Sequence, residues 1–174
     1  MAKLRKFCAY RHLKRPYTRI SKYRKKSFVR AHPHSVISHF VMGNRTKIFP
    51  IRADLVAKCS LQIRHNALES ARQVVNRRLQ NELGQKSYCF KLLLYPHHIL
   101  RENKMLSGAH ADRLQTGMAH SFGRTVGLAV QAKRGKTLFR VKVLSNGIEH
   151  AKKALRLAYP RMPGTYTIDV RKLN

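Results

Sequence analysis

The chain has 174 residues, of which 37 are Lys or Arg and 7 are Asp or Glu, so its formal net charge is +30. Its hydrophobic share is 43%, as in ordinary globular proteins, and a packed core is therefore expected. Self-repulsion at this charge opposes compaction, whereas a polyanionic partner removes the repulsion and releases condensed counterions. Nucleic acid is the partner that the composition favours.

A membrane surface is the other polyanion to consider. The longest apolar stretch, Leu92–Tyr95, is far shorter than the roughly 20 residues needed to span a bilayer. The basic N-terminus is not followed by the apolar segment of a secretory signal. The cysteines Cys8, Cys59 and Cys89 are far apart and odd in number, which indicates reduced thiols rather than a disulfide framework. We expect a cytosolic protein with no membrane partner.

Residues 1–46 are uniformly basic and are interpreted as an arm. No acidic residue precedes Asp54, and aromatic residues are interleaved with the cations without a helical or strand pattern. Such a segment cannot bury enough apolar area to offset its ordering entropy. We expect an arm that orders on RNA, or else a solvated tail, which blocks of like charge often form. The candidate RNA contacts in this segment are Arg5, Lys6, Arg11, Lys14, Arg15, Tyr17, Arg19, Lys22, Arg24, Lys25 and Lys26.

Regular patterns begin at about residue 47. Ile48–Ile63 is rich in Ile, Leu and Val, which predicts one or two strands. Asn66 and Glu69 form a variant of the capping box and predict the start of a helix that stops at Gly84. The apolar stripe of this helix is Leu68, Ala71, Val75 and Leu79. The cations outside the stripe, which are expected to face RNA or water, are Arg72, Arg77 and Arg78.

The next segments alternate between strand patterns and irregular sequence. Tyr88–Tyr95 is a short apolar run and predicts a buried strand. His97–Arg124 has no clean periodicity and is interpreted as a long loop, which in a compact domain is usually functional. Val126–Lys133 and Thr137–Leu144 flank a turn at Arg134–Gly135 and predict a half-buried hairpin.

A second helix and a last strand complete the predicted domain. Asn146–Glu149 repeats the capping pattern. The core face of the helix is Ile148, Ala151, Leu155 and Ala158. The alternating apolar residues of the strand are Tyr166, Ile168 and Val170. The elements predict an α+β domain over residues 47–174, with a mixed sheet covered by two helices.

Several stretches resemble a known family. They are Arg15–Arg19 (RPYTR), Met42–Asn44 (MGN), Gln62–Arg72 (QIRHNALESAR), Tyr95–Met105 (YPHHILRENKM) and Gly108–Arg113 (GAHADR). In order and spacing they closely resemble the archaeal and eukaryotic branch of the universal large-subunit ribosomal protein sixteen family, called ten-e in the older naming. The length, without a long C-terminal extension, is similar to the archaeal members.

The resemblance implies a β-hammerhead α+β fold that binds large-subunit rRNA. It also implies a mobile loop that points toward the peptidyl-transferase region and the P-site tRNA. The matching loop positions are Arg101, Glu102, Asn103, Lys104, Met105, Leu106, Ser107, Gly108, Ala109, His110, Ala111 and Asp112. The implied partners are large-subunit rRNA, P-site and A-site tRNA and neighbouring ribosomal proteins, with no cofactor, no catalytic activity and no homo-oligomer.

The candidate contacts outside the arm lie beside the loop and at a strand-to-helix junction. Arg101, Lys104 and Arg113 are interpreted as phosphate contacts, with an ordinary solvated loop as the alternative. Met105 and Leu106 either wedge against RNA or anchor the loop to the domain. The candidates flanking the loop are His97, His98, Arg113, Gln115 and Arg124, and those at the junction are Arg64 and His65.

The adjacent histidines His97 and His98 raise the question of catalysis or metal binding, because histidine titrates near neutrality. Paired Cys or His ligands at zinc spacings are absent from the sequence, and the seven acidic residues are scattered. We therefore expect structural or RNA-contacting histidines and no metal site. Two alternatives are a metal-independent ribonuclease that uses two histidines and a free-standing basic protein that compacts nucleic acid.

Overall fold

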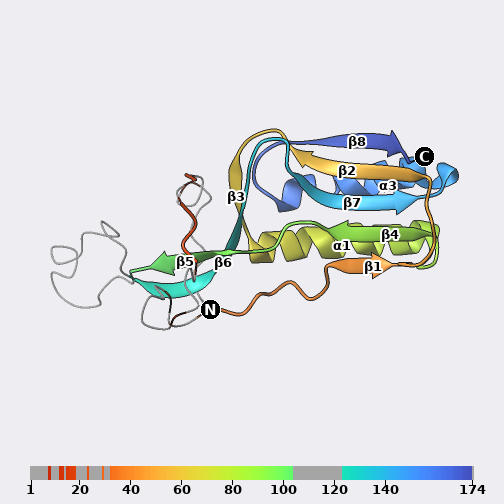
Figure 1. Cartoon of the computed structure of the whole chain (residues 1–174). Helices are drawn as coiled ribbons and strands as arrows, with labels where there is room; N and C mark the ends of the chain where they lie inside the picture. Colours follow the sequence, from red (N-terminus) through yellow and green to blue (C-terminus); the bar gives the residue numbers. More distant parts are fainter. Residues whose placement is uncertain are drawn as a thin grey trace.

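The computed structural model describes residue 8, residues 12–13, 15–18, 23 and 29, and residues 32–103 and 123–173. These residues form an α+β fold with two α-helices and two antiparallel sheets (Figure 1). The larger sheet and both helices make up one end of the molecule, and the smaller sheet makes up the other. The predicted α+β class is confirmed, but the expected mixed sheet is wrong, since every strand pair is antiparallel.

The five-stranded sheet has the strand order β1–β4–β7–β2–β8. Its strands are β1 (Val41–Gly43), β4 (Tyr88–Leu92), β7 (Thr137–Val143), β2 (Ile51–Ala57) and β8 (Tyr166–Lys172). Antiparallel partners lie on the same face of a sheet, and side chains alternate between faces along each strand. One face is therefore apolar and forms the core, while the other carries polar side chains.

The three-stranded sheet has the order β3–β6–β5, with β3 at Leu61–Arg64, β6 at Arg124–Ala132 and β5 at His98–Glu102. The predicted strands in 48–63 are confirmed as β2 and β3. The predicted hairpin is wrong, because β6 and β7 belong to different sheets and each pairs with other strands. Strand β5 lies inside the segment 97–124 that the sequence indicates as a loop, because a five-residue strand that ends in two charged residues, Arg101 and Glu102, leaves no clear alternation.

A corner joins the two sheets. Strands β2 and β3 follow one another through residues 58–60, and β6 and β7 follow one another through residues 133–136. At this point the Ala57 amide donates to the Lys136 carbonyl at 3.0 Å, and the Gly135 amide donates to the Ala57 carbonyl at 2.8 Å. The β2–β3 and β6–β7 connections therefore pass from one sheet to the other side by side, at the same corner.

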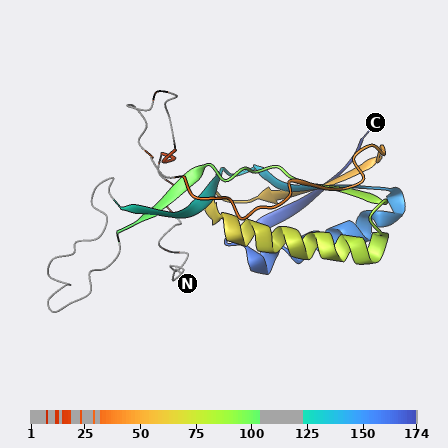
Figure 2. The ribbon, with the colours of Figure 1, turned by 90° about the horizontal axis from the view of Figure 1, so that it is seen from below.

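Helices α1 (His65–Leu83) and α3 (Ile148–Arg156) lie on the same face of the five-stranded sheet (Figure 2). The expected apolar stripes are confirmed. The stripe residues that are fully buried are Leu68, Ala71, Val75, Leu79, Ala151, Leu155 and Ala158. Gly84 ends α1 with a φ of 73°, a conformation that glycine reaches without strain. Short 3₁₀ helices at Ser145–Gly147 and Tyr159–Arg161 flank α3.

The predicted capping boxes are wrong. Helix α1 begins one residue earlier than Asn66, and neither Arg64 nor Gly147, which precede α1 and α3, caps its helix through a side chain. Glu69 bonds Arg72 instead of the helix end. Glu149 lies in the first turn of α3, where it complements the helix dipole, and it bonds Lys152.

The chain joins the sheet ahead of residue 47. Strand β1 pairs with β4 from Val41 to Gly43, and the Leu92 amide donates to the Phe40 carbonyl at 2.8 Å. Ile37 and Met42 are buried in the main core. Residues 37–43 are therefore packed on the domain.

Two further observations bear on the protein's environment. Among the described residues, neither helix combines the length and apolar character that crossing a bilayer requires. The three cysteines are free, with Cys8 and Cys59 exposed and Cys89 buried.

Candidate nucleic-acid interface

The three-stranded sheet brings together candidate residues that are far apart in sequence. Arg64 on β3 and His98 on β5 both pair with Ala129 of the central strand β6, so the three residues form one row on one face. A register shift between Leu100 and Arg101 places Arg101 opposite Thr125. The residue that this shift leaves unpaired, Val126, lies on β6, so the alternation of β5 is unbroken. Arg101 therefore lies on the face of Ile99, and Arg64 and His98 lie on the opposite face.

Tyr17 ties the N-terminal region to β5. Its backbone amide donates to His98 Nδ1 at 2.8 Å, and its carbonyl accepts from the Ile99 amide at 2.9 Å. The guanidinium carbon of Arg101 lies 3.7 Å from the centre of the Tyr17 ring, which is a cation–π contact. The ring also packs on a small apolar cluster of Val29, Ile99 and Leu128. Tyr17 and Arg101, both predicted as RNA contacts, therefore also bind each other.

Burial favours the neutral form of His65 and His98 at this end. Burial lowers the pKa of His98 to about 4, with smaller contributions from the charges of His97 and Arg101. Burial also lowers the pKa of His65, followed by the charge of Arg64. A neutral imidazole fits the observed bonds, because His98 Nδ1 and His65 Nδ1 accept from the Tyr17 and Val36 amides, respectively.

Glycine at position 127 makes room for His65. A Cβ at Gly127 would lie 3.4 Å from His65 Nε2. Since Gly127 lies two residues before Ala129 on β6, both are on one face, and the imidazole packs over the face that carries Arg64 and His98. Small residues in the central strand therefore let the basic side chains gather above it.

The connection between β5 and β6 begins and ends at this three-stranded sheet. Glu102, the last residue of β5, pairs with Arg124, the first residue of β6. Residues 103–123 thus leave and re-enter the sheet at two adjacent positions. Arg101 and Glu102 were expected in the loop but belong to β5, so the start of the expected loop moves to Asn103.

Other predicted contacts are exposed or lie outside the described residues. Arg15 and Arg124 are exposed, and His97 is partly buried, with Nδ1 3.1 Å from the Tyr95 carbonyl. The predictions that lie outside the described residues are Arg5, Lys6, Arg11, Lys14, Arg19, Lys22, Arg24, Lys25, Lys26, Lys104, Met105, Leu106, Ser107, Gly108, Ala109, His110, Ala111, Asp112, Arg113 and Gln115.

Two features were missed from the sequence. The contact between Tyr17 and Arg101 joins residues 84 positions apart, and only the motif match of both segments hinted at it. Arg72, expected to face RNA or water, is instead 7% exposed. It binds Glu69 at 2.6 Å and Ser38 at 3.0 Å, and therefore ties the segment before β1 to α1. The short i,i+3 spacing of Glu69 and Arg72 was the available signal.

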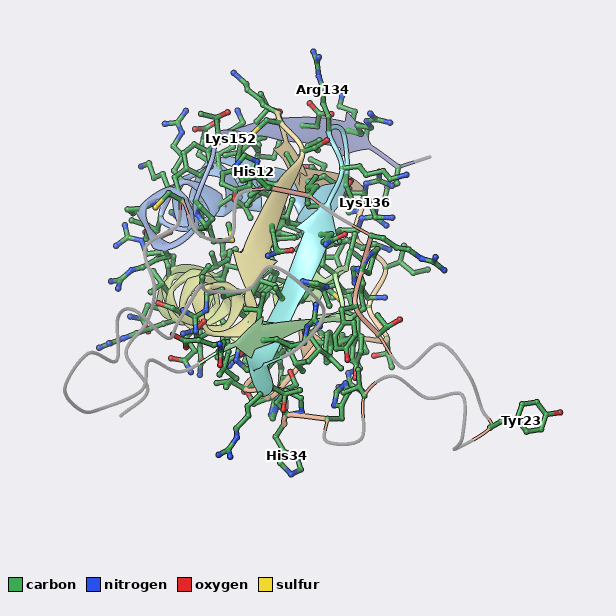
Figure 3. All side chains as sticks on the ribbon, turned by 90° about the vertical axis from the view of Figure 1, so that its left-hand side faces the viewer. His12, Tyr23, His34, Arg134, Lys136 and Lys152 are labelled. Carbon is green, nitrogen blue, oxygen red and sulfur yellow. The ribbon has the colours of Figure 1, made fainter. Side chains whose placement is uncertain are left out.

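Cations also surround the domain beyond this end. Viewed toward the three-stranded sheet, nitrogen-tipped side chains project on several sides, among them Arg134 and Lys136 near the corner and Lys152 on α3 (Figure 3). Within the described part of the chain, no cluster of three or more His, Cys, Asp or Glu side chains is suited to a metal ion. The arrangement suits binding of phosphates over a wide surface rather than chemistry at one point.

Comparison with known proteins identifies the family. Residues 18–169 match the family described as ribosomal protein L16p/L10e. The chain is 43% identical over 170 residues to large ribosomal subunit protein uL16 of Methanococcus aeolicus, covering 97% of this chain and 95% of the relative. The proteins of the same name from Archaeoglobus fulgidus and Staphylothermus marinus are each 43% identical over 94% and 85% of this chain, and over 90% and 82% of their own lengths. The chain therefore belongs to the ribosomal protein L16p/L10e family.

Proposed function

We propose that this protein is a structural constituent of the large ribosomal subunit that binds large-subunit rRNA. In this proposal the connection between β5 and β6 extends toward the peptidyl-transferase region and the P-site tRNA, and supports tRNA positioning. Of the expected arm, residues 1–46, the part ahead of residues 37–43, which pack on the domain, acts as an RNA-bound arm. The β-hammerhead type of fold is part of the same expectation. Neighbouring ribosomal proteins and the A-site tRNA are the remaining partners.

One observation carries the proposal. The family match spans residues 18–169, and within it Arg101 near the end of β5 and Arg124 at the start of β6 lie at the two ends of the 103–123 connection, on the same three-stranded sheet as Arg64. Basic side chains at the two ends of a loop can bind phosphates of the RNA backbone and so fix the ends in place. The middle of the loop then remains free to contact another partner. A net charge of +30 supports a polyanionic surrounding for the rest of the chain.

The family is one of ribosomal proteins and not of enzymes. This membership excludes the ribonuclease alternative. The histidine geometry agrees, because a pKa of about 4 keeps His98 neutral at physiological pH, and its Nδ1 is occupied by the Tyr17 amide.

Co-sedimentation tests the assignment to the subunit. A tagged copy should track the large subunit in stoichiometric amount through washes at moderate salt. A general nucleic-acid compactor would instead spread over free RNA, small subunits and DNA. The second distribution would contradict the proposal and favour the compactor.

Removal of the loop tests its role. Replacing residues 104–112 by a short Gly–Ser linker keeps the pairing of Glu102 with Arg124 and should preserve incorporation into the subunit. Reactions that depend on P-site tRNA should then become slower. The matched control replaces the exposed residues 133–136 at the corner turn by a linker of equal length. Failure of the loop variant to incorporate would make the segment an assembly element instead.

A further inference from the structure

The face of the five-stranded sheet opposite the helices carries a set of aligned cations. Cys89, Lys142, Arg52 and Arg171 are successive partners across β4, β7, β2 and β8. The next row across the same strands consists of Lys91, Arg140, Asp54 and Asp169. In the described part of the chain both helices lie on the other side of the sheet (Figure 2). Cys89 and Asp54 are buried within these rows, whereas none of the five cations is. We call the two rows the open face, which carries five cations and two carboxylates.

The arrangement is unfavourable for a free sheet. Lys142 lies directly opposite Arg52, Arg52 lies opposite Arg171, and Lys91 lies opposite Arg140. Like charges at directly opposite positions of paired strands repel each other and destabilise the sheet. Only part of this repulsion is relieved inside the face, by Asp54 and by Asp169, which lies 3.6 Å from Arg171. A bound anion would relieve the rest.

Asp54 fixes two of the guanidinium groups. Its side chain is 5% exposed, and its Oδ2 lies 2.9 Å from Nε and 2.8 Å from Nη2 of Arg52. Arg140 donates from Nε to Oδ1 at 2.9 Å and from Nη2 to Oδ2 at 3.2 Å. The Nη1 group of each guanidinium takes no part in these contacts, and both arginine side chains remain about one quarter exposed, at 25% and 26%. The carboxylate thus holds two arginines in fixed orientation, with donors left for a ligand.

We propose that this open face is a second RNA-docking surface, which binds the phosphate backbone of rRNA through Arg52, Arg140 and Lys142, with Lys91 and Arg171 at its margins. The inference rests on the proposed function, because it assumes rRNA as the partner and adds a surface away from the three-stranded sheet. Phosphate is the favoured ligand, since a guanidinium held in a plane presents paired donors to its oxygens. Binding here would place the two sheets against RNA at separate points.

Removal of the three charges that are not bound to Asp54 tests the surface. The variant Lys91→Gln, Lys142→Gln, Arg171→Gln leaves the contacts of Asp54 with Arg52 and Arg140 in place. The control Lys153→Gln, Arg156→Gln, Arg161→Gln removes the same charge from exposed residues in or next to α3, in the helix layer. The full chain is titrated with a cognate large-subunit rRNA fragment at several salt concentrations, after thermal unfolding has shown that both variants fold.

The two variants should differ in salt dependence. Each duplex phosphate contact contributes about 0.9 to the slope of log K against log salt, so the sheet variant should lose roughly 2–3 in slope and the control less than about 1. Equal losses would overturn the docking surface and leave a general charge effect. A wild-type protein that does not prefer cognate rRNA over an unrelated RNA would instead contradict the proposed function.

A charge-conserving change tests the orienting role of Asp54. Arg140→Lys keeps the cation beside Asp54 but loses the planar fork, so it should weaken rRNA binding several-fold with little change in salt slope. Arg156→Lys on α3 is the control and should have no effect. Unchanged binding by Arg140→Lys would rule out the oriented guanidinium. Crosslinking of Lys91 and Lys142 to protein rather than to rRNA in the assembled subunit would also overturn the proposal.

Discussion

Glu69 and Arg72 form a buried ion pair one turn into α1. Their side chains are 5% and 9% exposed, and the guanidinium also donates to Met42 Sδ and Ser38 Oγ. The hydrogen bond from Arg72 is the main cause that lowers the pKa of Glu69 to about 2, against the opposing effect of burial. Because partners come from both α1 and residues 38–42, this pair decides how the N-terminal region is fixed to the domain.

Removal of the buried charge should therefore destabilise the fold. Glu69→Gln leaves Arg72 buried without its counter-ion, and we expect a loss of about 3 kcal/mol in the free energy of unfolding. Glu149→Gln is the control, since its i,i+3 pair with Lys152 is 70% exposed on the glutamate side and exposed pairs contribute little. Urea titration compares the two. Equal effects would contradict the structural role of the buried pair.

The pKa shift of His98 gives a pH dependence. Its folded-state pKa is about 4, below the ordinary 6.5, so the unfolded chain takes up the proton first as the pH falls. The contribution of neutral His98 is thus complete above pH 6.5 and is lost progressively toward pH 4. His98→Asn should reduce the fall in melting temperature over this window, whereas a change at exposed His34 should not (Figure 3). Identical profiles for wild type and His98→Asn would contradict the assignment.

At the scale of elements, the close approach of strand β1 to strand β4 depends on one glycine. Gly43 has a φ of 80°, and a Cβ at this position would overlap the Tyr88 carbonyl oxygen of the paired strand β4. The same carbonyl accepts from the Asn44 amide at 2.8 Å. Strand β1 can approach β4 this closely only without a side chain at residue 43.

Gly43→Ala should detach β1. The left-handed backbone alone costs about 1–2 kcal/mol, and the overlap with Tyr88 adds to it because backbone atoms must move. Gly84→Ala is a matched control, with a φ of 73° but nothing within 4 Å of the added Cβ. Hydrogen exchange of the Leu92 amide, which bonds Phe40, reports on β1 directly. Equal exchange rates in the two variants would rule out a steric role for Gly43.

The sequence predicted the elements that have a repeating pattern and missed those that depend on distant partners. The stripe from Leu68 to Leu79 and the alternation along β7 follow from local periodicity, and the structure confirms them. The last strand is confirmed as β8, but its burial does not alternate as predicted, because Val170 is exposed. The assignment of β6 and β7 to different sheets is decided by the corner, which local alternation does not encode. Likewise Glu69 matched a capping box, but burial beside Arg72 gave it a stronger partner than the helix end.

For the candidate site, too, the sequence predicted which residues take part but not how they group in space. Their basic and aromatic types were readable from composition, but their grouping depends on pairings such as that of Arg64 and His98 across Ala129. The bulge at Val126, which sets Arg101 opposite Thr125, has no sequence signature of its own. The family resemblance indicated these distant segments as parts of one site, which periodicity could not do, because the matching motifs occur in all of them.

At the scale of the whole molecule, the excess of positive charge is the dominant feature. The described residues contain a complete apolar core beneath the five-stranded sheet, yet cations project from several sides of the domain (Figure 3). Repulsion among them is screened over about 10 Å at 0.1 M salt and over about 30 Å at 0.01 M. The free protein should therefore be least stable at low ionic strength.

Salt and polyanions should both stabilise the isolated chain. We expect the melting temperature to rise between about 0.01 M and 0.15 M salt. At low salt, added cognate rRNA should raise it further by mass action, since the folded state presents the aligned cations. Differential scanning calorimetry on the full chain measures both. A melting temperature that is indifferent to salt and to RNA would contradict the electrostatic basis of the proposed function.

The corner between the sheets has a mechanical consequence. Two neighbouring strands cross it together, and the Ala57, Lys136 and Gly135 backbones are bonded across it, with the Arg134 amide donating to Ser60 Oγ at 3.0 Å. Such a double crossing has no single hinge, because bending one strand requires breaking its bonds to the other. The orientation of the three-stranded sheet, which carries Arg101 and contacts Tyr17, is thus fixed relative to the five-stranded sheet and its helices. A force that displaces the three-stranded sheet would therefore also move the five-stranded sheet and its helices, instead of bending the chain at the corner.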